Sequence, residues 1–264
     1  MTLPNFEELL EKYAQLIVEI GVNVQKGHTI VLRAAVDQAP LARLIVKKAY
    51  ELGAAEVLMQ WSDDVITKEF MLHAADDRIA TVPQYKIEES NDWLEKGASR
   101  ISLVSNDPGA LAGVDGKRLA TFSKANNAAF APLMQALQAN KYSWTVVAAA
   151  SPAWAKTVFP ELNEEEAVDA LWDQIFKATR IYADDPVQAW KEHDANLLEK
   201  AKWLNKEQFV ALHYTAPGTD LTIGLPKGHH WEAASSHNSR GEFFMANMPT
   251  EEVFTAPDSR NVNG

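Results

Sequence analysis

The stretch His28–Trp61 decides the fold class of this chain. It begins with "HTIVLRAAV", His28–Val36, an apolar and β-branched run that predicts a buried strand. "PLARLIVKKAYELG", Pro40–Gly53, has helical spacing, with a proline suited to a first helical turn and a glycine suited to a helix end. "EVLMQW", Glu56–Trp61, is again strand-like. Two strands joined by such a helix need a crossover connection, so the stretch predicts parallel neighbours in an α/β sheet.

The same alternation continues on both sides of this stretch. Near the N-terminus, apolar residues recur at helical spacing, and Gly21 stands where a C-cap glycine belongs. Two more strands are predicted at "RISLVS", Arg100–Ser105, and "SWTVVAAA", Ser143–Ala150, separated by a long helical region, residues 115–140, with a break at Pro132. We therefore expect an α/β fold, a mostly parallel sheet flanked by helices, whose crossovers are right-handed and whose strand order is open.

The pattern changes near residue 206. Two helices precede this point: "NEEEAVDALWDQIFKATRI", with Asn163 and Glu166 spaced as a capping box, and "DPVQAWKEHDANLLEKAKWL". Short strands follow it: "EQFVALHY" and "LTIGLP" form a predicted hairpin, and "EFFMA" and "EEVFTA" come later. We predict a first domain at residues 1–206, with two trailing helices, and the start of a β-rich second domain at residues 207–264.

Composition excludes several classes of protein. A formal net charge of −11 over 264 residues argues against nucleic acid and anionic membrane surfaces as partners. The chain has no cysteine, so disulfides, thiolate metal sites and cysteine nucleophiles are excluded, and any metal must be held by His, Asp and Glu. The N-terminus lacks the positive start of a signal peptide, and no apolar run approaches a transmembrane span. We expect a cytoplasmic protein without membrane or nucleic-acid partners.

The predicted α/β domain contains no glycine-rich phosphate-binding motif. Neither "RAAVDQAP", Arg33–Pro40, nor "SNDPGALAG", Ser105–Gly113, matches G-x-G-x-x-G or a P-loop. A small-molecule or nucleotide-binding module stays open as an alternative, with its ligand near these two loops at the carboxyl ends of strands. A non-catalytic dimerisation domain is the other alternative, because the second half is rich in tryptophan, although buried core is the commoner place for tryptophan.

Two further motifs give weak signals for chemistry. Ser151 precedes Pro152 and follows a strand, which is typical of a helix N-cap, and no G-x-S-x-G elbow is present. The one histidine cluster, "GHHWEAASSH", Gly228–His237, lies in a predicted loop. Adjacent histidines on an extended backbone point to opposite sides, so they rarely bind one ion together.

The motif "PTEEVFT", Pro249–Thr255, places two carboxylates in a short β-prone run. In a strand Glu251 and Glu252 point to opposite faces, so one can face a pocket while the other faces solvent. A carboxylate metal site needs further ligands, and none follows in the chain. From the residues alone, a strand end with solvated acids is the favoured interpretation.

Several stretches spread over the whole chain combine into a pattern. The most specific is "ANMPTEEVFTAPD", whose unusual order of residues is typical of a family signature; the others are "EKYAQLIVEIGVNVQKG", "ISLVSNDPGAL", "SPAWAKTVFPELNEEEA" and "LHYTAPGTDLTIGLPKGHHWEAA". Together they resemble the metal-dependent aminopeptidase family of aminopeptidase T, aminopeptidase S and PepS, and the resemblance to the PepS type is strongest.

The resemblance implies a two-domain cytoplasmic homodimer that removes N-terminal residues from peptides with two divalent ions, such as zinc or cobalt. In the family, a glutamate of the signature is the first metal ligand in chain order. It corresponds to Glu252, with Glu251 as the less favoured choice. The remaining ligands of the family lie beyond the position of Gly264, and the resemblance assigns no catalytic residue here. We therefore expect an N-terminal fragment, with an incomplete catalytic domain in residues 207–264, that binds no ion tightly and is inactive alone.

Overall fold

The computed structural model describes residues 3–105 and 107–264, which form two compact units. The first unit holds the described residues up to Val187 together with Ser236–Pro249, and the second holds Gln188–Ser235 and Thr250–Gly264. The chain therefore leaves the first unit, returns to it for a short segment, and ends in the second.

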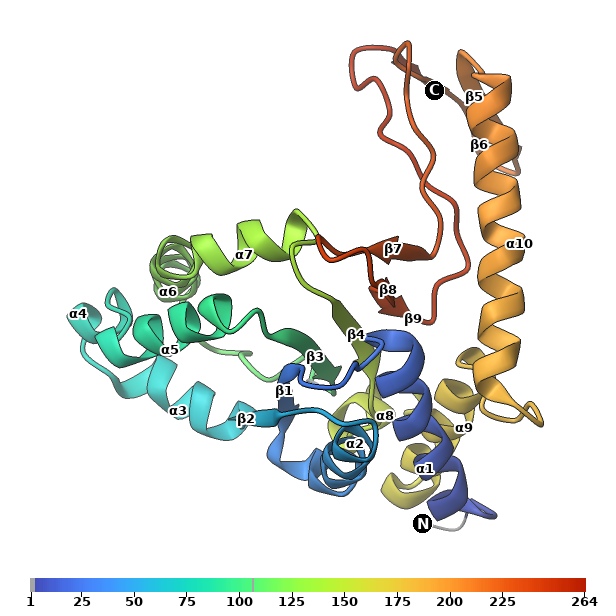
Figure 1. The fold of residues 1–264 in the computed structure, drawn as a ribbon. Helices are drawn as coiled ribbons and strands as arrows, with labels where there is room; N and C mark the ends of the chain where they lie inside the picture. The colour runs from blue at the N-terminus through green and yellow to red at the C-terminus, as the bar shows by residue number, and fades with distance from the viewer. Residues whose placement is uncertain (1–2, 106) are drawn as a thin grey trace. The chain divides into compact units, whose positions relative to one another are not determined.

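A five-stranded sheet in the order β2-β1-β3-β4-β9 forms the centre of the first unit, and all its neighbouring strands are parallel (Figure 1). The prediction of an α/β fold with a parallel sheet is confirmed. Four of the strands are the predicted apolar runs, whereas the fifth, β9, is not predicted by any sequence pattern. The strands are β1 Thr29–Ala35, β2 Glu56–Ser62, β3 Ser99–Val104, β4 Trp144–Ala148 and β9 Asn247–Met248.

Helices cover both faces of this sheet, as Figure 1 shows. The predicted break near Pro132 is present between α6 and α7, and the predicted capping box of Asn163 and Glu166 begins α9. The helices of the first unit are α1 Phe6–Leu16, α2 Ala39–Glu51, α3 Asp64–His73, α4 Asp76–Ile79, α5 Gln84–Glu95, α6 Gly116–Ala129, α7 Ala131–Gln138, α8 Pro152–Val158 and α9 Glu164–Ala178, with a π-helix η1 at Ile17–Gly21 and a 3-10 helix η2 at Val36–Gln38.

An aromatic cluster joins α1 to α9. Phe176 is fully buried and stacks on Trp172 with ring centroids 5.3 Å apart, and the rings of Phe6 and Tyr13 each lie 6.0 Å from it. The hydroxyl of the buried Tyr13 donates a 2.8 Å hydrogen bond to the carbonyl oxygen of Ala148 at the end of β4. The cluster therefore fixes the first helix both to another helix and to the sheet.

A second cluster covers the opposite face of the sheet. Val31 of β1 packs with Trp93 of α5, Leu133 of α7 and Ala98, and Leu58 of β2 lies against this group. Because Val31 and Leu58 are register partners, the cluster occupies one face of β1 and β2 under α5 and α7. Only part of this face is apolar, because Arg33, Gln60 and Arg100 line a pocket beside the cluster.

Gly21 ends the helical segment, as predicted, but not as a left-handed C-cap. Its backbone is outside the positive-φ region in which the C-cap role would place it. A Cβ atom on Gly21 would lie 3.0 Å from Cγ2 of Thr145 in β4 and 3.1 Å from Cε of Met248 in β9. The glycine is therefore required for the close approach of the helix to these two neighbouring strands.

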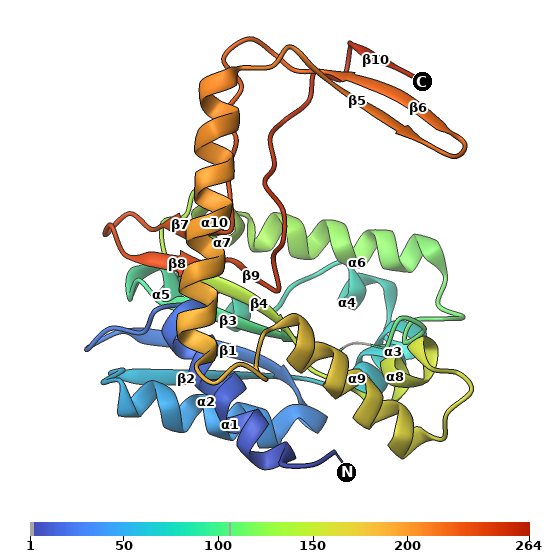
Figure 2. The same ribbon diagram turned by 90° about the vertical axis from the view of Figure 1, so that its right-hand side faces the viewer.

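The second unit begins in α10, Pro186–Glu207, and contains the predicted hairpin. Strands β5 Ala211–Ala216 and β6 Thr219–Gly224 pair antiparallel, and β10 Val262–Asn263 pairs with β6 (Figure 2). The predicted strand "EFFMA" is present in the first unit, as β8 Phe243–Met245, which pairs with β7 Ser235–His237. The predicted division into an α/β domain at residues 1–206 and the start of a catalytic domain at residues 207–264 stays a prediction.

The predicted strand "EEVFTA" is wrong. Phe254 makes a single antiparallel bridge with Glu232, and residues 250–253 lie in no strand. A β-prone composition needs a partner strand to become a strand, and only one residue of this run has a bridge partner.

Within residues 3–105 and 107–264, no helix combines the length and the apolar character that crossing a membrane requires.

Candidate functional site

The segment that carries Glu251 and Glu252 is anchored on both sides. Before it, Met248 of β9 is buried and pairs with Val147 of β4. After it, the backbone of Phe254 exchanges two hydrogen bonds with that of Glu232, at 2.9 Å and 3.0 Å. The two glutamates are exposed between these anchors. Their position therefore follows from backbone pairing rather than from burial of their own side chains.

The carboxylate of Glu252 bends back onto its own segment. Its Oε2 accepts a 2.8 Å hydrogen bond from the backbone N–H of Glu251. A backbone donor of this kind restricts the orientation of the carboxylate. Glu252 thus presents a solvent-accessible, oriented oxygen ligand, while the contribution of Glu251 to this arrangement comes from its main chain.

The side chain of Glu251 lies beside a histidine that the sequence did not single out. Nε2 of His193, in α10, is 3.3 Å from Oε2 of Glu251 and 2.8 Å from the carbonyl oxygen of Thr250. A carbonyl oxygen can only accept, so Nε2 carries the proton in this arrangement. The ring of the fully buried Trp190 meets His193 edge-on, with centroids 5.4 Å apart. His193 therefore holds the backbone and side chain at positions 250 and 251.

The described residues fit one position of a metal site and do not form a whole one. Within residues 3–105 and 107–264, no three side chains of His, Cys, Asp or Glu lie close enough together to hold an ion. Glu252 has the chemistry of one ligand for a hard or borderline divalent ion. Nε2 of His193 is not available as a second ligand atom, because its proton is donated to Thr250. The assignment of Glu252 or Glu251 as a metal ligand stays a prediction.

The histidine cluster does not provide the missing ligands. Nδ1 of the buried His229 lies 3.0 Å from the carbonyl oxygen of Pro226, to which it donates. His230 is exposed and 3.5 Å from Glu232. The loop itself is tied to α10, because Asn205 exchanges hydrogen bonds of 2.7 Å and 2.9 Å with the backbone of Trp231. The cluster is thus part of a structural loop in the described chain.

Ser151 acts as the helix cap that the sequence predicts. Its Oγ accepts a 3.3 Å hydrogen bond from the N–H of Trp154, and Pro152 stands at the first helical position of α8. A capping oxygen engaged with a helix N-terminus needs no catalytic function to explain it.

Comparison with known proteins places the chain in a family. The chain matches the family model described as thermophilic metalloprotease (M29) over residues 6–264. The chain belongs to the M29 family. The predicted resemblance to metal-dependent aminopeptidases is confirmed at this level.

Relatives of this M29 chain are similar along almost all of it. Aminopeptidase PepS of Streptococcus thermophilus is 59% identical over 265 residues, which cover 100% of this chain and 64% of PepS. Aminopeptidase AmpS of Bacillus subtilis is 49% identical over 262 residues, which cover 99% of this chain and 64% of AmpS. The structure of wild-type AmpT from Thermus thermophilus matches with a TM-score of 0.91 and 36% identity, covering 97% of this chain and 63% of AmpT. The chain thus spans slightly less than two thirds of these relatives.

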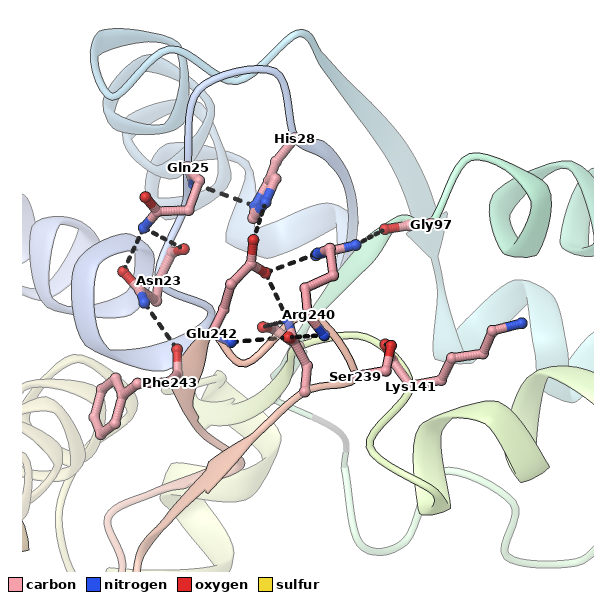
Figure 3. A network of polar contacts seen from close by, with 11 residues as sticks. Asn23, Gln25, His28, Gly97, Lys141, Ser239, Arg240, Glu242 and Phe243 are labelled. Atoms are coloured by element: carbon pink, nitrogen blue, oxygen red, sulfur yellow. Dashed lines mark hydrogen bonds and ion pairs between the residues drawn. The ribbon is translucent and has the colours of Figure 1, made fainter.

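A polar network in the M29 chain fixes residues 238–242 to the amino ends of the sheet strands (Figure 3). The Glu242 carboxylate accepts hydrogen bonds from Asn238 at 2.6 Å and Arg240 at 2.9 Å, and its other oxygen lies 3.1 Å from Nε2 of His28, just before β1. Nη1 of Arg240 donates to the carbonyl oxygen of Gly97, before β3, at 3.3 Å. Because these contacts lie at the end opposite to the carboxyl ends of the strands, we interpret the network as structural.

Glu242 makes the stability of this network dependent on pH. Burial raises the pKa of its carboxyl group, but the hydrogen bonds from Asn238 and Arg240 and the charge of His28 outweigh burial, so the pKa is lowered overall. A lowered pKa in the folded state stabilises the protein above the ordinary carboxyl pKa of about 4.3, and this contribution is lost as the pH falls through the folded-state value.

We expect Glu242→Gln to destabilise the chain at pH 7 by about 1–3 kcal/mol, the range for a hydrogen bond to a charged group. The difference from wild type should shrink as the pH falls from about 4.3 through the lowered folded-state pKa of Glu242, because the wild-type carboxylate is then protonated too. Thermal unfolding from pH 3 to pH 7 measures both effects. Glu161→Gln, at an exposed glutamate of the same unit, is the matched control. A difference that is constant across this pH range would contradict the assignment.

Proposed function

We propose that this chain forms the N-terminal α/β part of a metalloaminopeptidase, together with the first ligand of its metal centre. The match to the M29 family over residues 6–264 carries this proposal. The relatives named aminopeptidase PepS and aminopeptidase AmpS support peptides as the substrate class. Residues 1–206 are the α/β domain in this proposal, and residues 207–264 are the start of the catalytic domain.

In this proposal Glu252 is the metal ligand, and Glu251 is the positioning residue. The hydrogen bond from the Glu251 N–H to the Glu252 carboxylate supports this division, because it orients an exposed oxygen ligand without using the Glu251 side chain. His193 contributes indirectly through its contacts with Thr250 and Glu251. Two divalent ions of the zinc or cobalt class, when bound, supply an acidified water and polarisation of the peptide carbonyl group.

The proposed enzyme is a cytoplasmic homodimer that acts on peptides. The net charge of −11 and the absence of cysteine are consistent with this setting, and the charge disfavours nucleic acid and anionic membranes as partners. We further propose that the chain alone neither binds a divalent ion tightly nor turns over peptides. The reason is chemical: one oriented carboxylate cannot fix the coordination geometry of an ion by itself.

A comparison of two proteins tests this proposal. The first is the chain as it stands, and the second is a chimera that appends the part of S. thermophilus PepS outside the aligned region. We expect no release of p-nitroaniline from amino-acid p-nitroanilides by the chain alone with zinc or cobalt, and no tight binding in isothermal titration, because the coordination shell is incomplete. The chimera should release p-nitroaniline and should bind the metal ion tightly.

Each arm has an outcome that contradicts a specific part of the proposal. Turnover by the purified chain alone would contradict its predicted inactivity. A chimera that folds, as judged by circular dichroism and cooperative unfolding, but neither binds metal nor cleaves any p-nitroanilide would contradict the proposed metalloaminopeptidase function. Acceptance of N-acetylated substrates equally well would argue against an aminopeptidase, since an acetyl group removes the free amine.

A further inference from the structure

One face of the parallel sheet carries an unusual group of polar side chains. Arg33 of β1 is the register partner of Gln60 in β2 and of Ser102 in β3, so the three lie side by side across the sheet. Arg100 stands two residues before Ser102 on the same face, because side chains alternate along a strand. Parallel sheets covered by helices on both faces are normally apolar throughout. Two arginines in this position therefore need an explanation.

These residues line a pocket of about 600 Å³, within the size range of small-molecule sites. Its floor includes Arg33, Gln60 and Arg100, and its walls come from β2, α5, α6 and α7. The aromatic residues of the walls include Trp93 of α5 and Phe122 of α6. The pocket adjoins the apolar cluster of the same face, because Trp93 and Leu133 belong to both. All of it lies within the first unit.

The two guanidinium groups are not neutralised by the described part of the protein. In residues 3–105 and 107–264, neither Arg33 nor Arg100 forms an ion pair with a carboxylate, and the polar contact of the Arg100 Nε atom is a 3.4 Å one with Oγ of Ser102. Burial and the nearby charge of Arg33 lower the pKa of Arg100 to about 10. Lys86 and Glu89 also line the pocket and nearly cancel each other in charge.

The chemistry of this pocket is that of an anion site with an apolar wall. Guanidinium groups bind carboxylate and phosphate groups through paired N–H donors. Arg33 is exposed, whereas Arg100 is partly buried. A partly desolvated cation such as Arg100 without a counter-ion is costly, and a bound anion removes this cost. The amide oxygen of Gln60 is buried without a hydrogen-bond partner in the described residues, so it can accept a hydrogen bond from an N–H or O–H group elsewhere on a ligand.

We infer that the pocket over Arg33 and Arg100 binds a small organic anion, whose carboxylate or phosphate group lies between the two guanidinium groups. The apolar or aromatic part of the anion packs against the side chains of Trp93 and Phe122. This site is separate from the proposed metal ligand at Glu252, and it needs neither a metal ion nor peptidase activity. It can therefore be tested on the chain as it stands.

Isothermal titration with three probes tests this inference. Adenosine monophosphate represents a phosphate with an aromatic body, indole-3-acetate represents an aromatic carboxylate, and inorganic phosphate represents the anion alone. We expect saturable binding of at least one organic anion, weakened by salt, and weaker binding of inorganic phosphate because it cannot use the aromatic wall. Binding of the nucleotide alone would identify phosphate as the recognised group, and binding of indole-3-acetate alone would identify carboxylate.

Variants connect the binding to the two arginines. Arg33→Gln and Arg100→Gln should each weaken the binding by about 10–100-fold, the range for a hydrogen bond to a charged group. Arg33→Lys keeps the charge and should retain part of the affinity, which guards against a variant that fails to fold. Arg43→Gln, at an exposed arginine of α2, is the matched control and should bind as wild type does. Failure of all three probes at millimolar concentration, or equal loss in Arg43→Gln, would overturn the inference.

Discussion

Replacing Glu252 with glutamine in the chimera is expected to lower kcat/KM for an amino-acid p-nitroanilide by about 100-fold or more. Loss of a residue that merely supports a metal ligand already costs about 10–100-fold, and Glu252 is the proposed ligand itself. Glutamine preserves the shape of the side chain but removes its charge, which a divalent ion requires for tight binding. Bound metal, measured by plasma mass spectrometry after dialysis, should fall together with activity.

Two further variants make this expectation specific. Glu251→Gln should have a smaller effect, because the contact that orients Glu252 comes from the backbone N–H of Glu251. Glu199→Gln, at an exposed position of α10, should leave activity and metal content unchanged. If Glu252→Gln kept its metal while Glu251→Gln lost it, the ligand would be Glu251. If both variants kept full activity and metal content, the segment would have no metal-binding function.

Replacing Phe176 with alanine should destabilise the first unit by about 3–5 kcal/mol, the range measured for large aromatic side chains in protein cores. Phe176 is fully buried and contacts four other aromatic rings, those of Phe6, Tyr13, Trp172 and Tyr182, so its removal leaves a cavity and also breaks the ring contacts. Urea unfolding of the chain, followed by circular dichroism, measures this loss. It is a large part of the total stability of a typical domain, which is about 5–15 kcal/mol.

The size of the effect should depend on the volume that is lost. Phe176→Leu keeps most of the apolar volume and should cost clearly less than Phe176→Ala. Val65→Ala, at a side chain that is 72% exposed, should change stability by no more than about 0.5 kcal/mol. A Phe176→Ala variant as stable as Val65→Ala would show that the aromatic cluster does not hold α1 and α9 on the sheet.

The central sheet could be predicted because its signals are local. Each of β1 to β4 is an apolar run flanked by helical periodicity, and the crossover rule then requires parallel pairing. The capping box at Asn163 and the break before α7 were likewise visible in a few adjacent residues. In contrast, β9 has only two residues, and its place beside β4 depends on the close approach at Gly21. No local pattern encodes such a contact.

The candidate sites were less accessible from sequence for the same reason. The motif with Glu251 and Glu252 is visible in the sequence, but the strand predicted to carry them is absent, because in this run only Phe254 has a bridge partner. His193 looks like any other histidine on a helix, and its contact with Thr250 depends on the fold. Arg33 is the first residue of "RAAVDQAP", near which the sequence allows a ligand site. Arg100 becomes the neighbour of Arg33 only when β1 and β3 pair, and no local pattern predicts this pairing.

Strand β9 also has a consequence for how the protein is made. The sheet cannot be completed on the ribosome until Met248 has left the exit tunnel, long after β4 has been synthesised. A nascent chain that stops near residue 206 lacks β9, so the outer edge of β4 presents unpaired backbone donors and acceptors that invite association with other chains. Because Glu251 and Glu252 follow β9 directly in sequence, the closing of the sheet and the synthesis of the proposed metal ligand occur almost together.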